Sequence, residues 1–226
     1  IKYPKEIILV RHAEMIGNVL ESDDSASHEL SNHQFGLTPV GEEQVKHTQS
    51  WLVRRYPDGF DVAFVSTFAR TKLTYNALSR GFSQFPPEKI DSRLDEKHDG
   101  IIHSMTKNDR VKYFPWIEET REKEGWYHFR APGGRNGPDV ELSIHSFLRD
   151  LREFYPHKTC LIICHGHWLT LLDRIIFNLT VKEVEMQKSA KLTANCSVTI
   201  FEPDNFGGLR CTVKRKVPWE GKIKVG

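Results

Sequence analysis

Residues that can bind an anion and carry out group transfer follow short apolar runs at several points of this sequence. Arg11 and His12 come directly after Ile7–Val10, Arg70 lies shortly after a second run, and His165 ends a third. The planar fork of an arginine side chain matches two phosphate oxygens at once, so two arginines beside one crevice favour a phosphoryl group. The same cations would repel a metal ion, which makes an anion site the better interpretation.

Transfer of a phosphoryl group needs a nucleophile, stabilisation of the charge on the phosphoryl oxygens, and a proton for the leaving oxygen. His12 can act as the nucleophile and form a phosphohistidine. Arg11, Arg70 and His165 can stabilise the transferring group. Glu96, which follows a further expected strand, can donate the proton if its surroundings keep it protonated.

Other side chains near these residues could take some of the same roles. The carboxyl groups that compete with Glu96 are those of Glu14, Asp95 and Asp99. His165 and His167 form a His-x-His pair that could hold a metal ion, but the sequence offers no third ligand for it. We therefore expect neither a metal nor another cofactor.

The elements that must position these residues alternate between apolar strands and helices. The expected strands cover residues 7–10, 61–66, a short stretch at 90, 159–164, 196–201 and 209–216. The expected helices cover residues 39–56, 69–79, 139–155 and 168–177. This alternation predicts a three-layer α/β/α fold with a mainly parallel sheet and an antiparallel edge strand. Ligands bind at the carboxyl ends of strands in such sheets, where both arginines, both histidines and Glu96 would converge.

Helix starts and one long insertion complete the expected architecture. Thr38 followed by Pro39 is typical of a helix start, and Asp139 is expected to cap a later helix. Residues 97–138 form an aromatic-rich insertion with one expected helix at about 109–124. We expect this helical and loop segment to lie over the active site.

Length and composition are those of an ordinary globular protein. The 226 residues are 38% hydrophobic and 27% charged, which predicts a single domain over residues 1–226. No apolar run approaches the ~20 residues that span a bilayer, so no membrane partner is expected. The start shows no secretory signal, although a leader removed before Ile1 stays open. The four cysteines are few, and the predicted location is cytoplasmic.

The charge distribution bears on possible partners. A formal net charge of +2 is too balanced for a general nucleic-acid binder, so a small phosphorylated substrate is the expected partner. Residues 207–226 carry six basic residues and one acidic residue, which is typical of a solvated edge strand. An anion-attracting segment is the alternative interpretation. The oligomeric state stays open.

Five segments resemble, in their order along the chain, the motifs of the histidine phosphatase superfamily, the phosphoglycerate-mutase-like family. The segments are Leu9–Asn18 with Arg-His-Ala-Glu, Leu37–Gln44 with Leu-Thr-Pro, Ser66–Thr74 with its Ser, Arg and Thr spacing, Arg93–Gly100 with Glu96, and Cys164–Gly166. Together they lie within residues 7–168. Five ordered matches on the expected elements make chance a poor explanation.

The resemblance implies a role for each matching residue. It implies that His12 is the phosphorylated histidine, that Glu96 is the proton donor, and that no metal is required. The phosphate pocket that it implies consists of Arg11, Arg70 and His165, with Asn18 as an additional donor.

Several positions depart from the family motifs. Ala13 stands where the family has Gly, and Met15 where it has Ser. Arg135 stands where the family's Pro-Gly-Gly-Glu-Ser segment has Glu, which adds a possible substrate-binding cation at the pocket rim. His167 is also atypical after His165-Gly.

Three functions stay open. The first is a phosphatase that transfers the phosphoryl group to water, and the second is a phosphoglycerate-type mutase that returns it to another oxygen. The third is a non-catalytic module that binds a phosphorylated ligand. Residues 21–34 form a polar loop where mutases of the family resemble one another in a Phe-Thr-Gly-Trp-like stretch, which favours the phosphatase. The complete set of His, Arg and Glu residues argues against the binding module.

Overall fold

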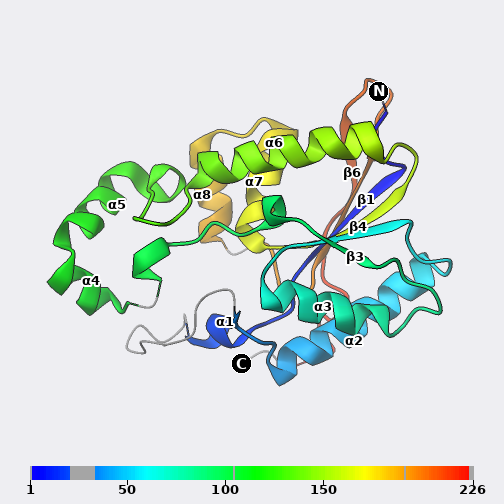
Figure 1. Cartoon of the computed structure of the whole chain (residues 1–226), viewed down its shortest axis with the longest axis horizontal. Coiled ribbons are helices and arrows are strands. Elements are labelled where there is room, and N and C mark those ends of the chain that lie inside the picture. The colour runs from blue at the N-terminus through cyan, green and yellow to red at the C-terminus, as the bar shows by residue number, and fades with distance from the viewer. Residues whose placement is uncertain (1, 21–33, 104, 191, 224–226) are drawn as a thin grey trace.

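A six-stranded sheet lies between two layers of helices in the computed structural model, which describes residues 2–20, 34–103, 105–190 and 192–223 (Figure 1). The strands are β1 (Glu6–Arg11), β2 (Val62–Val65), β3 (Glu88–Ile90), β4 (Thr159–Cys164), β5 (Val198–Pro203) and β6 (Leu209–Lys216). The helices are α1 (Ile16–Leu20), α2 (Pro39–Arg55), α3 (Ala69–Ser79), α4 (Lys107–Tyr113), α5 (Pro115–His128), α6 (Gly137–Phe154), α7 (Gly166–Phe177) and α8 (Val181–Ser189). The order of strands in the sheet is β3-β2-β4-β1-β5-β6.

The pairing of the strands brings four carboxyl ends to one edge of the sheet. β1 pairs in parallel with β4, β4 with β2, and β2 with β3. β5 pairs antiparallel with β1, and β6 pairs antiparallel with β5. The α/β fold with a mostly parallel sheet is therefore confirmed, and its antiparallel part consists of two strands.

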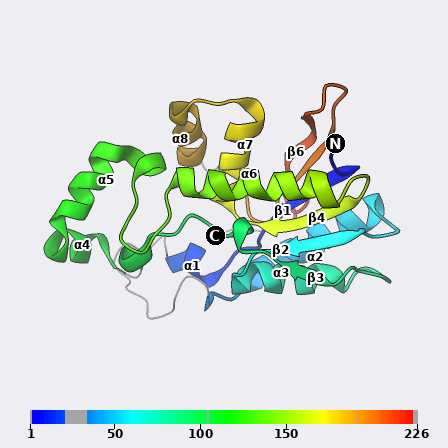
Figure 2. The ribbon, with the colours of Figure 1, turned by 45° about the horizontal axis from the view of Figure 1, so that its top comes forward.

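Alternating side chains of the central strands pack into two separate hydrophobic cores, one on each face of the sheet. Ile7 and Leu9 of β1 pack into the core under α6 and α7, whereas Ile8 and Val10 pack into the core under α2 and α3. The period of two along a strand sends neighbouring side chains to opposite faces of the sheet. Figures 1 and 2 show these two helix layers on either side of the sheet. All four side chains are buried because both faces of the sheet are covered.

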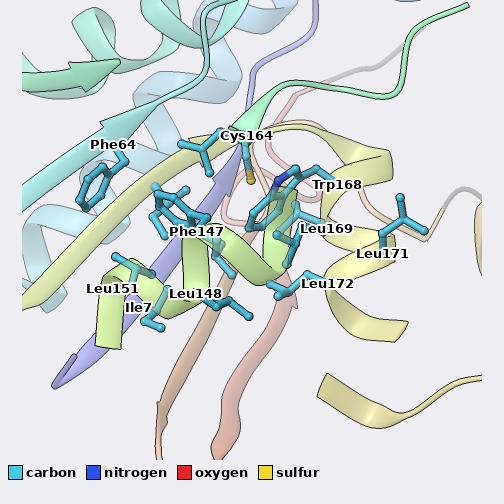
Figure 3. Packing of buried hydrophobic residues seen from close by; sticks show 14 of the residues in the cluster. Ile7, Phe64, Phe147, Leu148, Leu151, Cys164, Trp168, Leu169, Leu171 and Leu172 are labelled. Carbon is cyan, nitrogen blue, oxygen red and sulfur yellow. The ribbon is translucent and has the colours of Figure 1, made fainter. Parts of the chain in front are cut away.

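The core under α6 and α7 contains an aromatic series that joins the two helices to the sheet. Phe147 of α6 lies between Phe64 of β2 and Trp168 of α7, with ring centroids 5.3 and 6.3 Å away (Figure 3). The buried indole of Trp168 donates from Nε1 to the carbonyl oxygen of Arg93 at 3.0 Å. This contact holds the chain just before Glu96 against the start of α7.

The insertion differs from its predicted form. The sequence predicts one helix over 109–124, whereas the structure has α4 and α5. The chain leaves the helical region at Phe114 (φ −138°, ψ 53°), and Pro115 begins the second helix. A proline disfavours helical geometry at the residue before it, and it has no backbone N–H to continue a helix. The prediction of a single helix was therefore wrong at this position.

Two other predicted helix starts were wrong by two or three residues. Asn136, and not Asp139, caps α6: its Oδ1 accepts from the Asp139 backbone N at 3.1 Å. The Asp139 carboxylate accepts in return from the Asn136 backbone N at 3.0 Å, which completes a capping box. α7 begins at Gly166, where the sequence predicts a start at Trp168. Thr38 caps α2 and Pro39 opens it, as predicted.

Among the described residues, no helix combines the length and apolar character needed to cross a membrane. The helices α1 and α8 are present but were not expected from the sequence. α8 contributes Val184 to the core under α6 and α7, so the second helix layer is wider than predicted.

Candidate active site

His12 lies at the carboxyl end of β1, two per cent exposed, and faces His165 at the end of β4. The ring centroids of the two histidines are 5.2 Å apart, in an edge-to-face arrangement. The backbone N of His12 donates to the carbonyl oxygen of Cys164 at 2.9 Å, which continues the β1–β4 ladder by one bond. The two histidines are therefore placed by the central strand pair of the sheet.

The protonation state of His12 suits a nucleophile. Burial, then the charges of Arg70 and Arg11, lower the pKa of His12 well below its ordinary value of 6.5. The Nδ1 atom lies 2.7 Å from the carbonyl oxygen of Ala13, which can only accept, so we assign the proton of the neutral ring to Nδ1. Nε2 then carries the lone pair that could attack phosphorus.

His165 is held in the opposite tautomer by a chain of hydrogen bonds. The Arg70 guanidinium donates from Nε to His165 Nδ1 at 3.3 Å, which places the proton of this ring on Nε2. Nε2 lies 2.7 Å from Ser66 Oγ, and Ser66 donates to Asp95 Oδ1 at 2.8 Å. Burial, followed by the charges of Arg70, His12 and Arg11, lowers the pKa of His165 well below 6.5.

Phe68 supports both members of the Arg70–His165 pair and was not found by the sequence analysis. Its ring lies 5.0 Å from the His165 ring, edge to face, and 4.2 Å from the Arg70 guanidinium carbon. The Arg70 side chain is buried although it is charged, so its contact with an aromatic face compensates part of the lost hydration. No polar chemistry marks Phe68 in the sequence, which is why motif analysis passed over it.

Arg11, the last residue of β1, is framed by two segments from distant parts of the chain. Its Nη1 donates to the carbonyl oxygen of Thr193. A Cβ atom at Gly166 would lie 3.2 Å from Arg11 Nε, so the absence of a side chain there gives the guanidinium room beside the start of α7. The His-Gly pair at 165–166 thus combines a functional imidazole with space for the neighbouring arginine.

The turn after His12 is held rigidly by α2 and α3. Thr74 Oγ1 accepts from the Ala13 backbone N at 3.0 Å, and Gln44 Oε1 accepts from the Glu14 backbone N at 2.9 Å. A Cβ atom at Gly41 would lie only 2.2 Å from the Glu14 carbonyl oxygen, so α2 approaches this turn more closely than a side chain allows. These contacts give the second and third sequence motifs a structural role: they fix the backbone beside His12.

Asn18 and Asn195 meet beside the carbonyl oxygen of His12. Asn195 donates from Nδ2 to that oxygen at 3.0 Å and to Asn18 Oδ1 at 3.4 Å. Asn18 Oδ1 also accepts from the Met15 backbone N at 3.2 Å. Because its oxygen is engaged in these bonds, the Asn18 amide group can offer its N–H donors to an anion. Asn195 was missed by the sequence analysis because its partner is 183 residues away along the chain.

Glu96 approaches the site from the segment after β3. Its Oε2 accepts from the His167 backbone N in the first turn of α7 at 3.3 Å, and its Oε1 accepts from the Lys97 backbone N at 3.0 Å. The side chain is 12% exposed, which leaves it in reach of solvent. One of the competing carboxyl groups, that of Asp95, is engaged differently, because it accepts from Ser66 and Thr67.

Glu14, a second of the competing carboxyl groups, accepts from the Thr38 hydroxyl at 2.7 Å. Arg135 donates from Nη2 to Ser143 Oγ at 2.5 Å and to the Asp139 carbonyl oxygen at 3.1 Å, both in α6. Its backbone N donates to the His98 carbonyl oxygen at 3.0 Å, so the rim loop lies against the segment that carries Glu96. The guanidinium of Arg135 is therefore directed onto α6 in this conformation.

The described residues contain no group of three His, Cys, Asp or Glu side chains arranged to hold a metal ion. The histidine site has instead two guanidinium groups whose charges act on both imidazoles. The N-terminus of α7, capped by His165, adds backbone N–H groups and the positive end of a helix dipole. This arrangement can bind a compact anion and present His12 Nε2 to it.

Comparison with known proteins gives this geometry a family context. The chain is 29% identical over 230 residues to the phosphoglycerate mutase-like protein AT74H of Arabidopsis thaliana, covering 88% of this chain and 74% of that protein. Its fold is similar to that of the alpha-ribazole phosphatase from Shigella flexneri, with a TM-score of 0.74 and 19% identity over 94% of this chain and 98% of the other.

A second solved structure of similar fold is the mycobacterial glucosyl-3-phosphoglycerate phosphatase complexed with VO3. It has a TM-score of 0.69 and 18% identity, and the alignment covers 94% of this chain and 99% of the other. Residues 7–213 match the family description "Histidine phosphatase superfamily (branch 1)". The matched range includes the whole sheet except the first residue of β1 and the last residues of β6. The chain therefore belongs to the histidine phosphatase superfamily, branch 1.

Proposed function

We propose that the chain is a phosphomonoester hydrolase that works through a phosphohistidine on His12. The observation that carries this proposal is the state of His12, a buried neutral imidazole with Nδ1 directed to the Ala13 carbonyl oxygen and with the charges of Arg11 and Arg70 acting on it. Membership of the superfamily and the fold shared with two phosphatases support phosphatase activity in general terms.

The proposed reaction has two transfers. In the first, His12 Nε2 attacks phosphorus, the bond from phosphorus to the leaving oxygen breaks, and Glu96 gives that oxygen a proton. In the second, the Glu96 carboxylate takes a proton from water, the water oxygen attacks the phosphohistidine, and the N–P bond breaks. Inorganic phosphate leaves, and His12 and protonated Glu96 are both restored.

The remaining pocket residues bind the phosphoryl oxygens. Arg11 and Arg70 supply guanidinium donors, and Asn18 supplies an amide donor. His165 is kept in place by Arg70 and Ser66, so its ring is positioned before the substrate arrives. Since fixed cations occupy the place where a metal would otherwise neutralise the phosphate charge, we propose a reaction that needs no metal. We also keep the single domain over residues 1–226 and the cytoplasmic location as proposals.

Hydrolysis of p-nitrophenyl phosphate in the presence of EDTA, for the wild type and His12→Ala, tests the mechanism. We expect metal-free activity across the neutral pH range that is lost in the variant, because the nucleophile is gone. Wild-type protein quenched during turnover of a labelled substrate should carry an acid-labile, alkali-stable phosphate that His12→Ala lacks. Activity near the wild-type level in His12→Ala would reject the covalent mechanism.

The same experiment separates this proposal from the two alternatives. A mutase would return the label to a second oxygen of the substrate and release little inorganic phosphate. A binding module would bind phosphate without forming the acid-labile adduct. The residues 21–34 that bear on the mutase lie, except for Gln34, outside the described residues.

Arg135 stays a proposed substrate-binding residue at the rim. Its loop lies against His98, two residues from Glu96, but its guanidinium group contacts α6 in this structure. Binding to a substrate would require the guanidinium to leave Ser143. An unchanged ranking of a phosphomonoester panel in Arg135→Ala would remove this residue from the list of specificity determinants.

A further inference from the structure

The turn formed by residues 193–197, between α8 and β5, lies directly against the end of β1. The Cys196 backbone N donates to the carbonyl oxygens of Arg11 and His12, at 3.1 and 3.3 Å. In the other direction, the Arg11 backbone N donates to the Ser197 carbonyl oxygen at 3.2 Å. The backbone of two proposed site residues is therefore bonded to a turn that comes about 185 residues later in the chain.

Cys196 holds a backbone conformation that residues with a side chain rarely adopt. Its φ is 52°, in the left-handed region, and its side chain is fully buried. For a residue other than glycine this conformation costs free energy, and it persists only where the surrounding contacts determine it. One such contact comes from α2, where the buried Thr48 hydroxyl donates to the Cys196 carbonyl oxygen at 2.9 Å. Because strain of this kind gathers at functional sites, we examined what the turn positions.

The strained turn directs the Asn195 side chain to two members of the proposed site. Asn195 Nδ2 donates to the His12 carbonyl oxygen at 3.0 Å and to Asn18 Oδ1 at 3.4 Å. An amide group has its acceptor and its donors at opposite ends, so engaging the Asn18 oxygen leaves the Asn18 N–H groups for another acceptor. The orientation of Asn195 therefore sets which end of the Asn18 amide is offered to a phosphoryl group.

Trp219, in the segment after β6, fixes the peptide group of Asn195. Its indole Nε1 donates to the Asn195 carbonyl oxygen at 2.8 Å, and its ring packs against the core under α2 and α3. The Lys222 backbone N donates to the Trp219 carbonyl oxygen at 3.0 Å, which closes a turn at the indole. An indole N–H can only donate, so this bond holds one particular oxygen in one direction. The Asn195 peptide is thus attached to a ring that the core keeps in place.

We propose that Trp219 is a positioning residue of the active site. By holding the Asn195 carbonyl oxygen, Trp219 keeps the Asn195 amide bonded to the His12 carbonyl oxygen and to Asn18. The nucleophile and one phosphate donor then depend on the segment that follows the last strand. This inference deepens the proposed function and rests on it for the roles of His12 and Asn18. The alternative is that Trp219 only fills space at the edge of the core.

Binding of inorganic phosphate, measured by calorimetry in a double-mutant cycle, tests the proposal. Trp219→Phe removes the donor and keeps an aromatic ring, whereas Asn195→Ala removes the amide and keeps the carbonyl oxygen that Trp219 binds. Each single variant should weaken phosphate binding by about three- to tenfold, the effect of one hydrogen bond. Trp219→Phe should cause no further loss in the Asn195→Ala protein, because the indole then has no amide to position.

Turnover of p-nitrophenyl phosphate gives a second measurement. In each single variant kcat/KM should fall by a larger factor than phosphate affinity does, because a displaced His12 slows the transfer step as well. Trp51→Phe is the matched control: Trp51 of α2 packs against the same core, and the Arg55 guanidinium carbon lies 5.8 Å from its ring centroid. Trp51→Phe should change neither phosphate affinity nor kcat/KM. Urea unfolding establishes that each variant is folded.

The outcomes separate positioning from packing and from the proposed function. Unchanged phosphate affinity in Trp219→Phe, or a loss of the same size in the Asn195→Ala protein, would overturn the proposal. An equal loss in Trp51→Phe would assign the effect to packing and overturn it as well. If the wild type binds phosphate without hydrolysing phosphomonoesters, the proposed function fails, but the cycle still decides the role of Trp219. If Asn195→Ala does not fold, Asn18→Ala takes its place in the cycle, because Asn18 is the donor that Trp219 is proposed to position.

Discussion

The Arg70 guanidinium donates to His165 through Nε and Nδ1, 3.3 Å apart, and this single bond sets the direction of the hydrogen bonds that follow. It places the His165 proton on Nε2, where Ser66 Oγ accepts it at 2.7 Å, and Ser66 then donates to Asp95. A motif residue that the sequence assigns to phosphate binding therefore also fixes the tautomer of the second histidine. Four side chains from three segments of the chain form one connected series.

Replacement of Ser66 by alanine tests this series. Ser66→Ala leaves His165 Nε2 and one Asp95 interaction unsatisfied in a buried position, which should lower the free energy of unfolding by about 1–3 kcal/mol. The His165 ring should also lose its fixed orientation, and kcat/KM should fall by roughly a hundredfold. Urea unfolding and p-nitrophenyl phosphate kinetics measure the two effects. Ser50→Ala, on the exposed face of α2, is the control and should change neither.

Glu96→Gln should reveal which leaving groups need a proton. Loss of the acid should slow hydrolysis of alkyl phosphates by about 10²–10⁴-fold, and that of aryl phosphates much less, because an aryl oxide leaves without protonation. The glutamine can still accept from the His167 backbone N, so the segment should keep its place. The ratio of kcat values on matched alkyl and aryl substrates is the measurement. A Glu14→Gln variant that shows the same alkyl-specific loss would move the acid role to that residue.

The close approach of α2 to the turn after His12 predicts that replacement by alanine is harmful at Gly41 and harmless at Gly36. Gly41→Ala would place a Cβ atom 2.2 Å from the Glu14 carbonyl oxygen, so helix and turn must separate. We expect a loss of about 1–3 kcal/mol in the free energy of unfolding, together with lower activity. At Gly36 nothing lies within 4 Å of the added atom, so Gly36→Ala should be neutral. Equal effects at both positions would contradict this account of the motif.

The buried histidines make stability depend on pH. The folded-state pKa of His165 lies well below 6.5, so as the pH falls through 6.5 the unfolded chain binds a proton there that the folded protein does not. Stability should therefore be complete above pH 6.5 and decrease below it, by about 1.4 kcal/mol per pH unit for each such histidine. In His165→Gln, whose amide can serve the same partners, the stability lost between pH 6.5 and 5.5 in urea unfolding should be smaller by about 1 kcal/mol, because the unfolded histidine is only half protonated at pH 6.5. An unchanged slope would mean that His165 is protonated to the same extent in both states.

The sequence was sufficient to place those candidate site residues that lie in short motifs directly after the strands. His12, Arg70, Glu96 and His165 all lie where the motifs and strand order predict, because parallel strands bring their carboxyl ends together. Thr38 and Gly41 could be identified as parts of a helix start, but their contacts with Glu14 needed coordinates. Arg135 was placed on the rim loop by sequence, yet the direction of its guanidinium depends on Ser143 in another turn of α6.

What the sequence could not provide were contacts between residues far apart in the chain and without distinctive chemistry. Phe68 acts through the position of its ring, and Asn195 through a bond to a backbone oxygen across the sheet. Lys97 is next to Glu96 in the sequence, but its burial under Trp126 follows from the break between α4 and α5 and from the kink at Gly125. Such features depend on packing, which periodicity and motif spacing do not encode.

The central position of β1 has a consequence for how this protein is made. This strand is synthesised before the other strands of the sheet, but its neighbours are β4 and β5, which the ribosome completes roughly 150 and 190 residues later. At ordinary rates of translation, about 5–20 residues per second, the apolar residues of β1 stay unpaired on the nascent chain for on the order of ten seconds or more. The nucleophile is carried at the end of this same strand. Newly made chains thus expose an aggregation-prone segment throughout that interval, and chaperones that protect it would also protect the future active site.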